Sequence, residues 1–246
     1  MSLFRPQMRD EVADPDAKRS LNREMFDDIA RKYHITTRAL SFCRDASWKR
    51  ALAANLRPAS PPALCLDLAT GTGDIAALVA ERFPGAKIVG LDLSAEMIAL
   101  SRLRLPDGDR FEFVEGDIGA MPFSDDYADV ITGGYALRNV PDLDVALAEI
   151  FRVLKPGGIA SFLDFMKPVA PWRQRMDQAL LHFWGGVVGL AMHGRPWIYQ
   201  YIPESLAAYP DERTVREKLR AAGFDVTGGR RHFFGMLETI ELRKPA

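Results

Sequence analysis

The chain is poor in cysteine and carries almost no net charge. Its 246 residues include two cysteines, Cys43 and Cys65, and the formal net charge is -1. Two cysteines at this spacing exclude a disulfide framework and a cysteine-based metal cluster, so we expect no metal and a reducing environment. A near-neutral charge gives no support for nucleic-acid binding, which needs a basic surface.

The chain also lacks a long apolar run. The longest one, at 180–192, is too short to cross a bilayer and contains three glycines. Residues 1–11 have no apolar central region of the kind that a signal peptide carries. We therefore expect a cytoplasmic protein.

Apolar strand-like segments alternate with helical patterns through most of the chain. Strands are expected at 63–68, 87–91, 111–115, 129–132, 159–165, 225–227 and 236–242. This alternation predicts an α/β fold with a doubly wound, mostly parallel seven-stranded sheet. Ligands of such sheets bind beyond the carboxyl ends of the strands.

The flanking segments have a different character. Residues 1–20 are charged without a clear period and are predicted to be a flexible tail, followed by a single domain at 21–246. Residues 21–57 show helical spacing and are expected to form an N-terminal lid. Residues 168–203, rich in Trp, His, Met and Gly, are expected to form a helical insertion that covers the substrate.

The most specific local pattern is Leu-Asp-Leu-Ala-Thr-Gly-Thr-Gly-Asp at 66–74. It predicts a strand, a tight glycine turn and a helix N-terminus, which is a common place to hold a nucleotide-like cofactor. The glycine spacing, with Asp92 further along the chain, also fits a dinucleotide site. An NAD(P) oxidoreductase is therefore one alternative.

Two acids on either side of the turn bear on this choice. Asp67 and Asp74 would repel a pyrophosphate at short range but attract an ammonium or a sulfonium. S-adenosylmethionine carries both cations and no phosphate. The acids thus favour S-adenosylmethionine over NAD.

Acids also follow the second and third expected strands. Asp92 lies where a carboxylate could accept hydrogen bonds from both ribose hydroxyls. Asp117, next to Ile118, could accept from the adenine amino group while the isoleucine covers the ring. Three acids after three successive strands predict one adenosine-binding edge.

Several longer strings resemble a known family, the C-methyltransferases of quinone biosynthesis, which make menaquinone and ubiquinone precursors. They are the strings at 66–74, 116–117, 121–123, 136–140, 152–158 and 199–210, and upstream Phe26-x-x-Ile29-Ala30-x-Lys32-Tyr33, Leu40-Ser41-Phe42 and Trp48-Lys49-Arg50. The resemblance covers about residues 20–243. It implies a Rossmann-like methyltransferase fold, S-adenosylmethionine as methyl donor and S-adenosylhomocysteine as product.

The resemblance and the spacing together name the candidate site residues. Cofactor-binding candidates are Tyr33, Asp67, Ala69, Thr70, Gly71, Gly73, Asp74, Asp92, Leu93, Met97, Gly116, Asp117, Ile118, Gly133 and Tyr135. Candidate catalytic residues are Arg138, Asn139, His182 and His193, and candidate substrate residues are Trp184, Tyr199 and Tyr201.

The roles of the candidate catalytic residues follow from their chemistry. Arg138 is a poor base, so it would stabilise a phenolate or position a water. The alternative is that it pairs with a nearby acid such as Asp142. A histidine of the insertion could accept the proton.

The chain departs from the family at three positions of the N-terminal lid. His34 stands where the family usually has Asp, Thr37 where it has Asn, and Cys43 where it has Gly. The expected acceptor is accordingly a quinone-type or other phenolic ring that is methylated on carbon, and the alternative is another small molecule that is methylated on O, N or C. A small hydrophobic aromatic substrate, access to a membrane for a lipid quinone, and a homodimer are the expected partners.

Overall fold

The computed structural model describes residues 7–246, apart from the side chains of His193, Pro196 and Trp197. Its centre is a seven-stranded sheet in the order β3-β2-β1-β4-β5-β7-β6. β1 to β5 run parallel, whereas β7 is antiparallel to both β5 and β6. The strands are β1 Leu64–Leu68, β2 Lys87–Asp92, β3 Phe111–Glu115, β4 Ala128–Gly134, β5 Leu154–Phe165, β6 Asp225–His232 and β7 Leu237–Arg243. The predicted doubly wound α/β sheet is confirmed.

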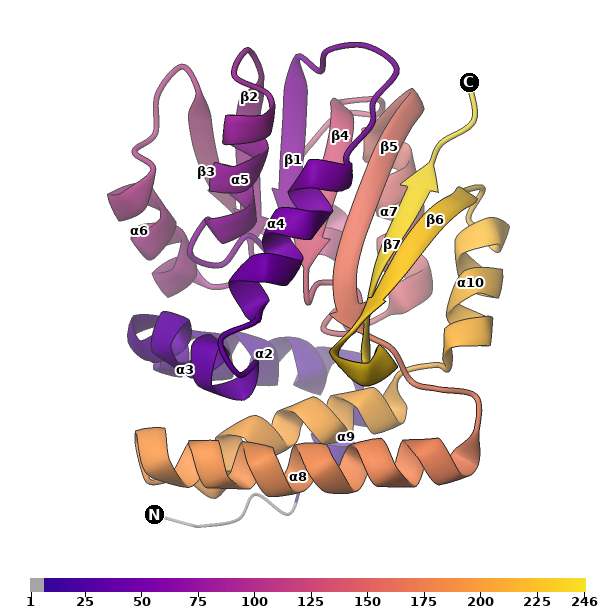
Figure 1. Cartoon of the computed structure of the whole chain (residues 1–246). Coiled ribbons are helices and arrows are strands. Elements are labelled where there is room, and N and C mark those ends of the chain that lie inside the picture. The colour runs from indigo at the N-terminus through magenta and orange to yellow at the C-terminus, as the bar shows by residue number, and fades with distance from the viewer. Residues whose placement is uncertain (1–6) are drawn as a thin grey trace.

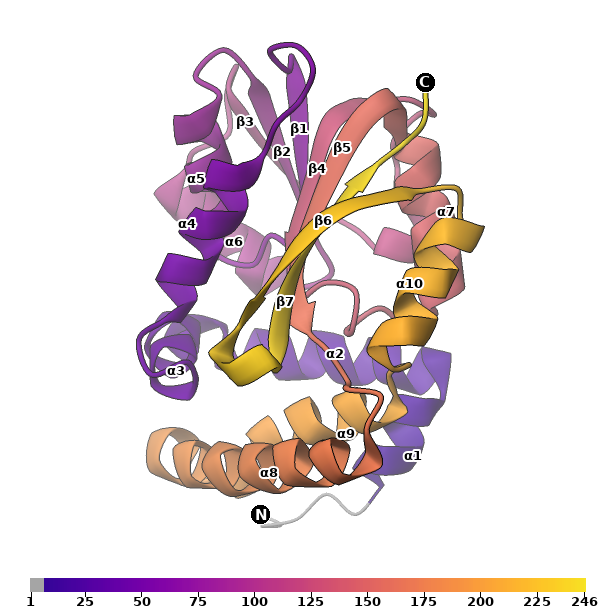
Figure 2. The same cartoon turned by 45° about the vertical axis from the view of Figure 1, so that its right-hand side comes forward.

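Helices cover both faces of the sheet and close one of its ends. Figure 2 shows α4, α5 and α6 on one face and α7 and α10 on the other. Figure 1 shows α2, α3, α8 and α9 below the carboxyl ends of the parallel strands. The helices are α1 Met8–Ala13, α2 Pro15–Ile29, α3 Tyr33–Leu40, α4 Asp45–Asn55, α5 Asp74–Arg82, α6 Ala95–Arg104, α7 Leu143–Val153, α8 Pro171–His193, α9 Tyr201–Ala208 and α10 Glu212–Ala221.

The prediction of a flexible tail at 1–20 is wrong for the described part of that segment. Residues 8–13 form α1 and α2 begins at Pro15, with Asp14 accepting a hydrogen bond from the backbone N–H of Ala17 at 2.8 Å. Met8 and Val12 are buried against α2 and α9. Charged residues conceal this apolar face in the sequence, because only the contact with a distant helix makes it a face. Residues 1–6 lie outside the described part.

The Lys-Pro-Gly-Gly segment at 155–158, which reads as a turn in the sequence, lies within a strand. β5 already begins at Leu154, and its pairing with β4 is interrupted between Leu154 and Ile159. Gly157 has φ +74 and donates its N–H to the carbonyl of Lys244 at 2.9 Å. The Lys-Pro-Gly-Gly string is therefore a bulge that the C-terminal segment completes.

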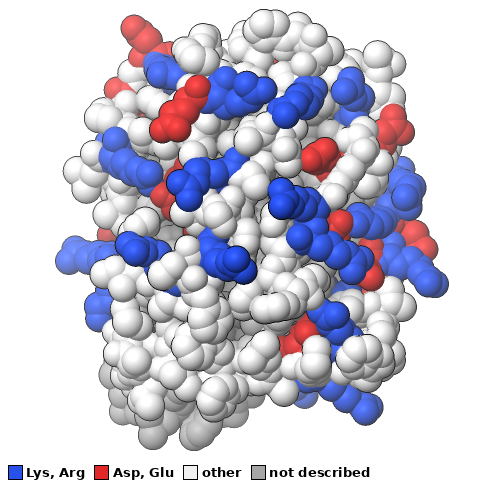
Figure 3. All heavy atoms as spheres, viewed as in Figure 1, with Lys and Arg blue, Asp and Glu red and all other residues white. Residues whose placement is uncertain are grey.

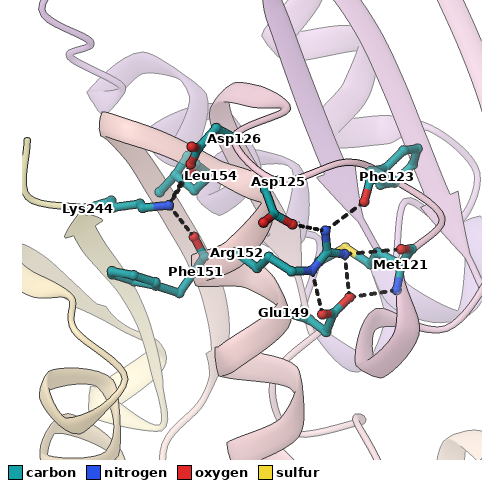
Figure 4. A network of polar contacts seen from close by, with 9 residues as sticks. All are labelled: Met121, Phe123, Asp125, Asp126, Glu149, Phe151, Arg152, Leu154 and Lys244. Carbon is teal, nitrogen blue, oxygen red and sulfur yellow. Dashed lines mark hydrogen bonds and ion pairs between the residues drawn. The ribbon is translucent and has the colours of Figure 1, made fainter.

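Two of the strings that mark the family meet in one polar network (Figure 4). Arg152 at the end of α7 donates to the carbonyls of Met121 and Phe123 and to the carboxylates of Glu149 and Asp125. Glu149 in turn accepts the backbone N–H of Met121 at 3.0 Å. This network holds the loop between β3 and β4 against α7, which indicates a structural role for both strings.

Candidate active site

Two neighbouring pockets lie beyond the carboxyl ends of the parallel strands. The first has a volume of about 700 Å³ and the second about 750 Å³. Four residues line both pockets: Phe26, Tyr33, Tyr135 and Asn139. The two pockets are therefore adjacent and meet at these four side chains.

The first pocket, which we call the cofactor pocket, contains most of the predicted cofactor residues. The predicted residues in its wall are Tyr33, Ala69, Gly71, Asp92, Leu93, Met97, Gly116, Asp117, Ile118 and Tyr135. The wall also includes residues that sequence reasoning missed, namely Asn22, Arg23, Phe26, Ser94, Gly134, Ala136, Val140 and Pro141. Three of these residues, Asn22, Arg23 and Phe26, come from α2. The spacing of Asn22 and Phe26 puts them on one face of the helix, but the sequence does not show that this face lies against the pocket.

Asp92 joins two elements at the edge of this pocket. Its carboxylate accepts the backbone N–H of Gly71 at 2.7 Å and that of Ser94 at 3.0 Å. Burial raises the pKa of Asp92 to about 6, although these two hydrogen bonds favour the ionised form. The end of β2 is thereby tied to the glycine turn, and the carboxylate still faces the pocket.

The two acids beside the turn are already engaged within the protein. Asp67 is 1% exposed and accepts hydrogen bonds from the hydroxyls of Thr70 and Thr132, each at 2.7 Å. Burial raises the pKa of Asp67 to about 6. It lies behind the turn and does not line the cofactor pocket.

Asp74 lies on the other side of the turn, beside a smaller cavity of about 270 Å³ that Thr70 also lines. Its carboxylate pairs with Lys49 at 3.0 Å and with Arg104. Burial alone would raise the pKa of Asp74, but these two cations lower it below its usual value. Since Lys49 and Arg104 neutralise Asp74, this acid would attract a cationic cofactor less strongly than the sequence predicted.

Two predicted glycines have structural roles. Gly73 caps the N-terminus of α5 with φ +77, a conformation that side chains disfavour. A side chain at Gly133 would lie 3.0 Å from both the carbonyl of Leu68 and the ring of Phe162. Neither glycine lines the cofactor pocket, although both shape the turn and the sheet beneath it.

Helix α2 lies across the cofactor pocket and contacts its walls at several points. Arg19 pairs with Asp117 at 2.6 Å, while Asp117 also accepts the backbone N–H of Gly119 at 2.8 Å. Lys18 donates to the carbonyls of Arg138 at 2.9 Å and Val140 at 2.7 Å. Burial lowers the pKa of Lys18 to about 8. The helix is thus fastened to both sides of the pocket.

The second pocket, which we call the acceptor pocket, is mainly apolar. Its wall contains the predicted residues Tyr199 and Tyr201 together with Arg138 and Asn139. The other lining residues are Met25, Phe26, Ile29, Tyr33, Thr36, Thr37, Leu40, Ser41, Trp48, Tyr135, Phe165, Ile198, Ile202, Phe233 and Leu237. A flat, apolar aromatic molecule with one polar group would fit such a pocket.

Arg138 is the buried cation of the acceptor pocket. It is 3% exposed, its Nε lies 3.6 Å from Asp164, and its guanidinium also donates to Ser205. The backbone N–H of Arg138 donates to the same Asp164 at 2.9 Å. The acid suggested from sequence, Asp142, instead caps α7, so Asp164 at the end of β5 is the partner. The sequence feature that could have indicated Asp164 is an acid near the carboxyl end of an apolar strand.

The remaining predicted residues are placed away from the pockets or outside the described part. The side chain of His182 is 41% exposed and lies 3.5 Å from Glu204, and it lines neither pocket. Trp184 packs behind Ile198 and Tyr199 without lining the acceptor pocket. The side chain of His193 lies outside the described residues. The structure therefore gives no support for His182 as a proton acceptor.

Solved structures share the fold of this chain at low sequence identity. A chain of the complex between the Haloferax volcanii Trm112 methyltransferase activator and a methyltransferase has a TM-score of 0.65, is 21% identical and covers 90% of this chain and 98% of its own. A SAM-dependent methyltransferase from Thermotoga maritima has a TM-score of 0.62, is 15% identical and covers 90% and 99%. These likenesses confirm the Rossmann-like methyltransferase fold.

Sequence comparisons identify the family. A demethylmenaquinone methyltransferase from Thermus thermophilus is 38% identical over 207 residues, which are 82% of this chain and 92% of that protein. The ubiquinone/menaquinone biosynthesis C-methyltransferase UbiE of Geobacter sulfurreducens is 35% identical over 222 residues, covering 87% and 84%. These matches confirm the predicted methyltransferase and leave the NAD(P) oxidoreductase without support. The ubiE/COQ5 methyltransferase family matches residues 15–240, and this chain belongs to it.

Proposed function

We propose that this chain transfers the methyl group of S-adenosylmethionine to a ring carbon of a quinol-type acceptor. The observation that carries the proposal is the wall that the two pockets share at Tyr33, Tyr135 and Asn139. One pocket offers carboxylates and backbone groups to an adenosine, and the other offers apolar side chains and one buried cation to a ring. The names of the relatives, which include a demethylmenaquinone methyltransferase, point to the same chemistry.

The cofactor pocket has donors and acceptors that fit S-adenosylmethionine. Asp92 is the candidate for the ribose hydroxyls, and Asp117 with Ile118 for the adenine. Asp117 already accepts from Arg19, so an adenine amino group would share this carboxylate with the guanidinium of α2. When bound, the cofactor supplies a methyl group on a positively charged sulfur.

Arg138 is the candidate for stabilising the acceptor. Deprotonating a ring hydroxyl moves electron density onto the neighbouring carbon, and a buried guanidinium stabilises the resulting phenolate. Arg138 cannot itself take the proton, because a guanidinium stays protonated in proteins. We propose that a water held by Arg138 accepts the hydroxyl proton. The ring carbon would then bond to the methyl group as the methyl–sulfur bond breaks and leaves a neutral thioether, and it would release its own proton to water.

We propose that Asn139 holds the wall of the acceptor pocket in place through two hydrogen bonds. Its side chain donates to the carbonyl of Tyr135 at 2.7 Å and accepts from the hydroxyl of Tyr201 at 3.1 Å. These bonds link the loop after β4 to α9 in the wall of the acceptor pocket. Asn139 would therefore orient the acceptor rather than exchange a proton with it.

The test is methyl transfer from labelled S-adenosylmethionine to a short-chain demethylmenaquinol. The reduced quinol should gain one methyl group on carbon, and the oxidised quinone, which lacks the ring hydroxyl, should gain none. A phenol that can be methylated only on oxygen serves as the control acceptor. Methylation of that phenol with no reaction of the quinol would overturn the proposed acceptor.

A second acceptor class is favoured by one observation. Thr37, one of the positions that departs from the family, lines the acceptor pocket and donates to the carbonyl of Tyr33 at 2.9 Å. A changed residue in that wall would suit an aromatic molecule of a different shape. The same assay with a panel of small phenols and amines tests this alternative.

A further inference from the structure

The outer face of α8 is an exposed apolar stripe. Six large side chains follow one another at intervals of three or four residues, namely Trp172, Met176, Leu180, Phe183, Val187 and Leu190. Phe183 is 70% exposed and Trp172 is 66% exposed. In Figure 3 the lower part of the molecule, where α8 lies, shows mostly uncharged side chains, while the charges gather above it and to its right. An apolar stripe of this length on a surface marks an interaction site.

The few charges on α8 have one sign where they are exposed. Its only acid, Asp177, is 3% exposed and lies near Arg173. Arg175 is exposed among the apolar residues of the stripe. Among its described residues, α8 therefore combines exposed apolar side chains with the cationic Arg175 and no exposed acid, which complements an anionic surface.

The stripe continues towards the acceptor pocket through a row of aromatic rings. Phe42, 55% exposed, stacks on Trp184 of α8 at 4.7 Å between ring centroids. Phe233 lies 5.9 Å from Phe42 and equally far from Phe234, which is 83% exposed. Phe233 lines the acceptor pocket. An apolar path thus joins the exposed face to the place where the acceptor ring would bind.

We propose that this face docks on the surface of an anionic lipid bilayer and admits an acceptor with a long apolar chain past Phe42 and Phe233. A contact between two copies of the chain would cover the stripe equally well, but it would not explain why an apolar path leads from the stripe to the acceptor pocket. None of the helices in the described ranges is long and apolar enough to cross a membrane, so α8 would lie in the interface. The delivery of the acceptor rests on the proposed function, whereas the docking does not.

The experiment is sedimentation of the full chain with vesicles of phosphatidylcholine alone and with added phosphatidylglycerol. The wild type should pellet with the anionic vesicles. The double variant Leu180→Glu/Phe183→Glu should bind these vesicles with an affinity at least about tenfold lower, because two apolar side chains that insert into the bilayer become charged. Leu103→Glu is the matched control, since Leu103 is 80% exposed on α6, and it should bind like the wild type.

Activity separates docking from chemistry. The double variant should methylate a short-chain quinol in solution at the wild-type rate and a long-chain quinol in vesicles at a reduced rate. Equal vesicle binding by the double variant and the wild type would overturn the proposal. The proposal would also be overturned if the wild type does not bind vesicles but forms a dimer that the double variant cannot form. Absence of any methyl transfer with intact vesicle binding would reject the proposed function and leave the docking face standing.

Discussion

The hydroxyl of Tyr135 donates a hydrogen bond of 2.7 Å to the carboxylate of Asp45. Asp45 also pairs with Lys49 at 2.7 Å, and Lys49 reaches Asp74 at the start of α5. These contacts fasten α4 to a residue that lines both pockets and that has φ +58. The position of the Tyr135 ring, in the wall of both pockets, therefore depends on a buried charge pair outside them.

Replacing Tyr135 with Phe should lower turnover without unfolding the protein. The ring stays and only the hydrogen bond to Asp45 is lost, so we expect kcat to fall about tenfold while cofactor affinity changes about threefold or less. Tyr127→Phe is the control, since Tyr127 stacks on Phe123 away from the pockets. Steady-state kinetics and calorimetry measure the two effects, and an unchanged kcat would contradict a positioning role.

Replacing Arg138 with Gln should remove the cation of the acceptor pocket. We expect kcat to fall by about 100-fold or more with little change in cofactor affinity, which is the usual cost of losing a group that stabilises a developing charge. Asp164→Asn should lower kcat less, because the guanidinium remains but loses its ion-pair partner. Lys87→Gln, in an exposed pair with Glu112, is the control. Equal losses of cofactor affinity and turnover would argue for a structural role.

Cofactor binding should depend on pH through Asp92. Its pKa of about 6 lies above the unfolded value of about 3.9, so the folded free protein takes up a proton and the stability that this provides is lost as pH rises from about 4 to 6. A carboxylate that accepts from the ribose must be ionised, so affinity should move in the opposite sense and increase about tenfold from pH 5 to pH 7. Calorimetry across this range measures it, and Asp92→Asn should flatten the profile and weaken binding.

Replacing Lys18 with Met should loosen α2 over the cofactor pocket. The substitution keeps the side chain's bulk but leaves the carbonyls of Arg138 and Val140 without their donor. We expect cofactor affinity to fall about tenfold, since an unpaired buried carbonyl costs about 1–3 kcal/mol. Hydrogen exchange of α2 should rise at the same time. Unchanged exchange and affinity would show that the other contacts of α2 suffice.

Replacing Cys43 with Gly should stabilise the protein. Cys43 is exposed and has φ +61, a conformation that costs a side chain about 1–2 kcal/mol and glycine little. We expect a gain of about 1 kcal/mol, reduced by the greater freedom of glycine in the unfolded chain. Gly194→Ala is the reciprocal test, because Gly194 has φ +64 and open space around it, and it should destabilise. Thermal denaturation of both variants measures the difference.

The sequence alone determined the sheet, the glycine turn and the edge at which Asp92 and Asp117 meet. These follow from local patterns, since a strand followed by an acid or a glycine is visible within a few residues and parallel strands bring their carboxyl ends to one edge. The resemblance to the family rested on the same short strings, two of which hold the loop near Arg152 rather than the reactants.

Only the tertiary structure decided which charges are already paired and which helix covers the site. Arg19 meets Asp117 across 98 residues, Lys18 reaches the loop after β4 across 120, and Arg138 finds Asp164 rather than its near neighbour Asp142. The sequence could not show that the apolar stripe of α8 faces outward, because this too depends on how distant elements pack. A helical period shows that a face exists, but the packing of distant elements decides whether that face is buried, paired or left to the solvent.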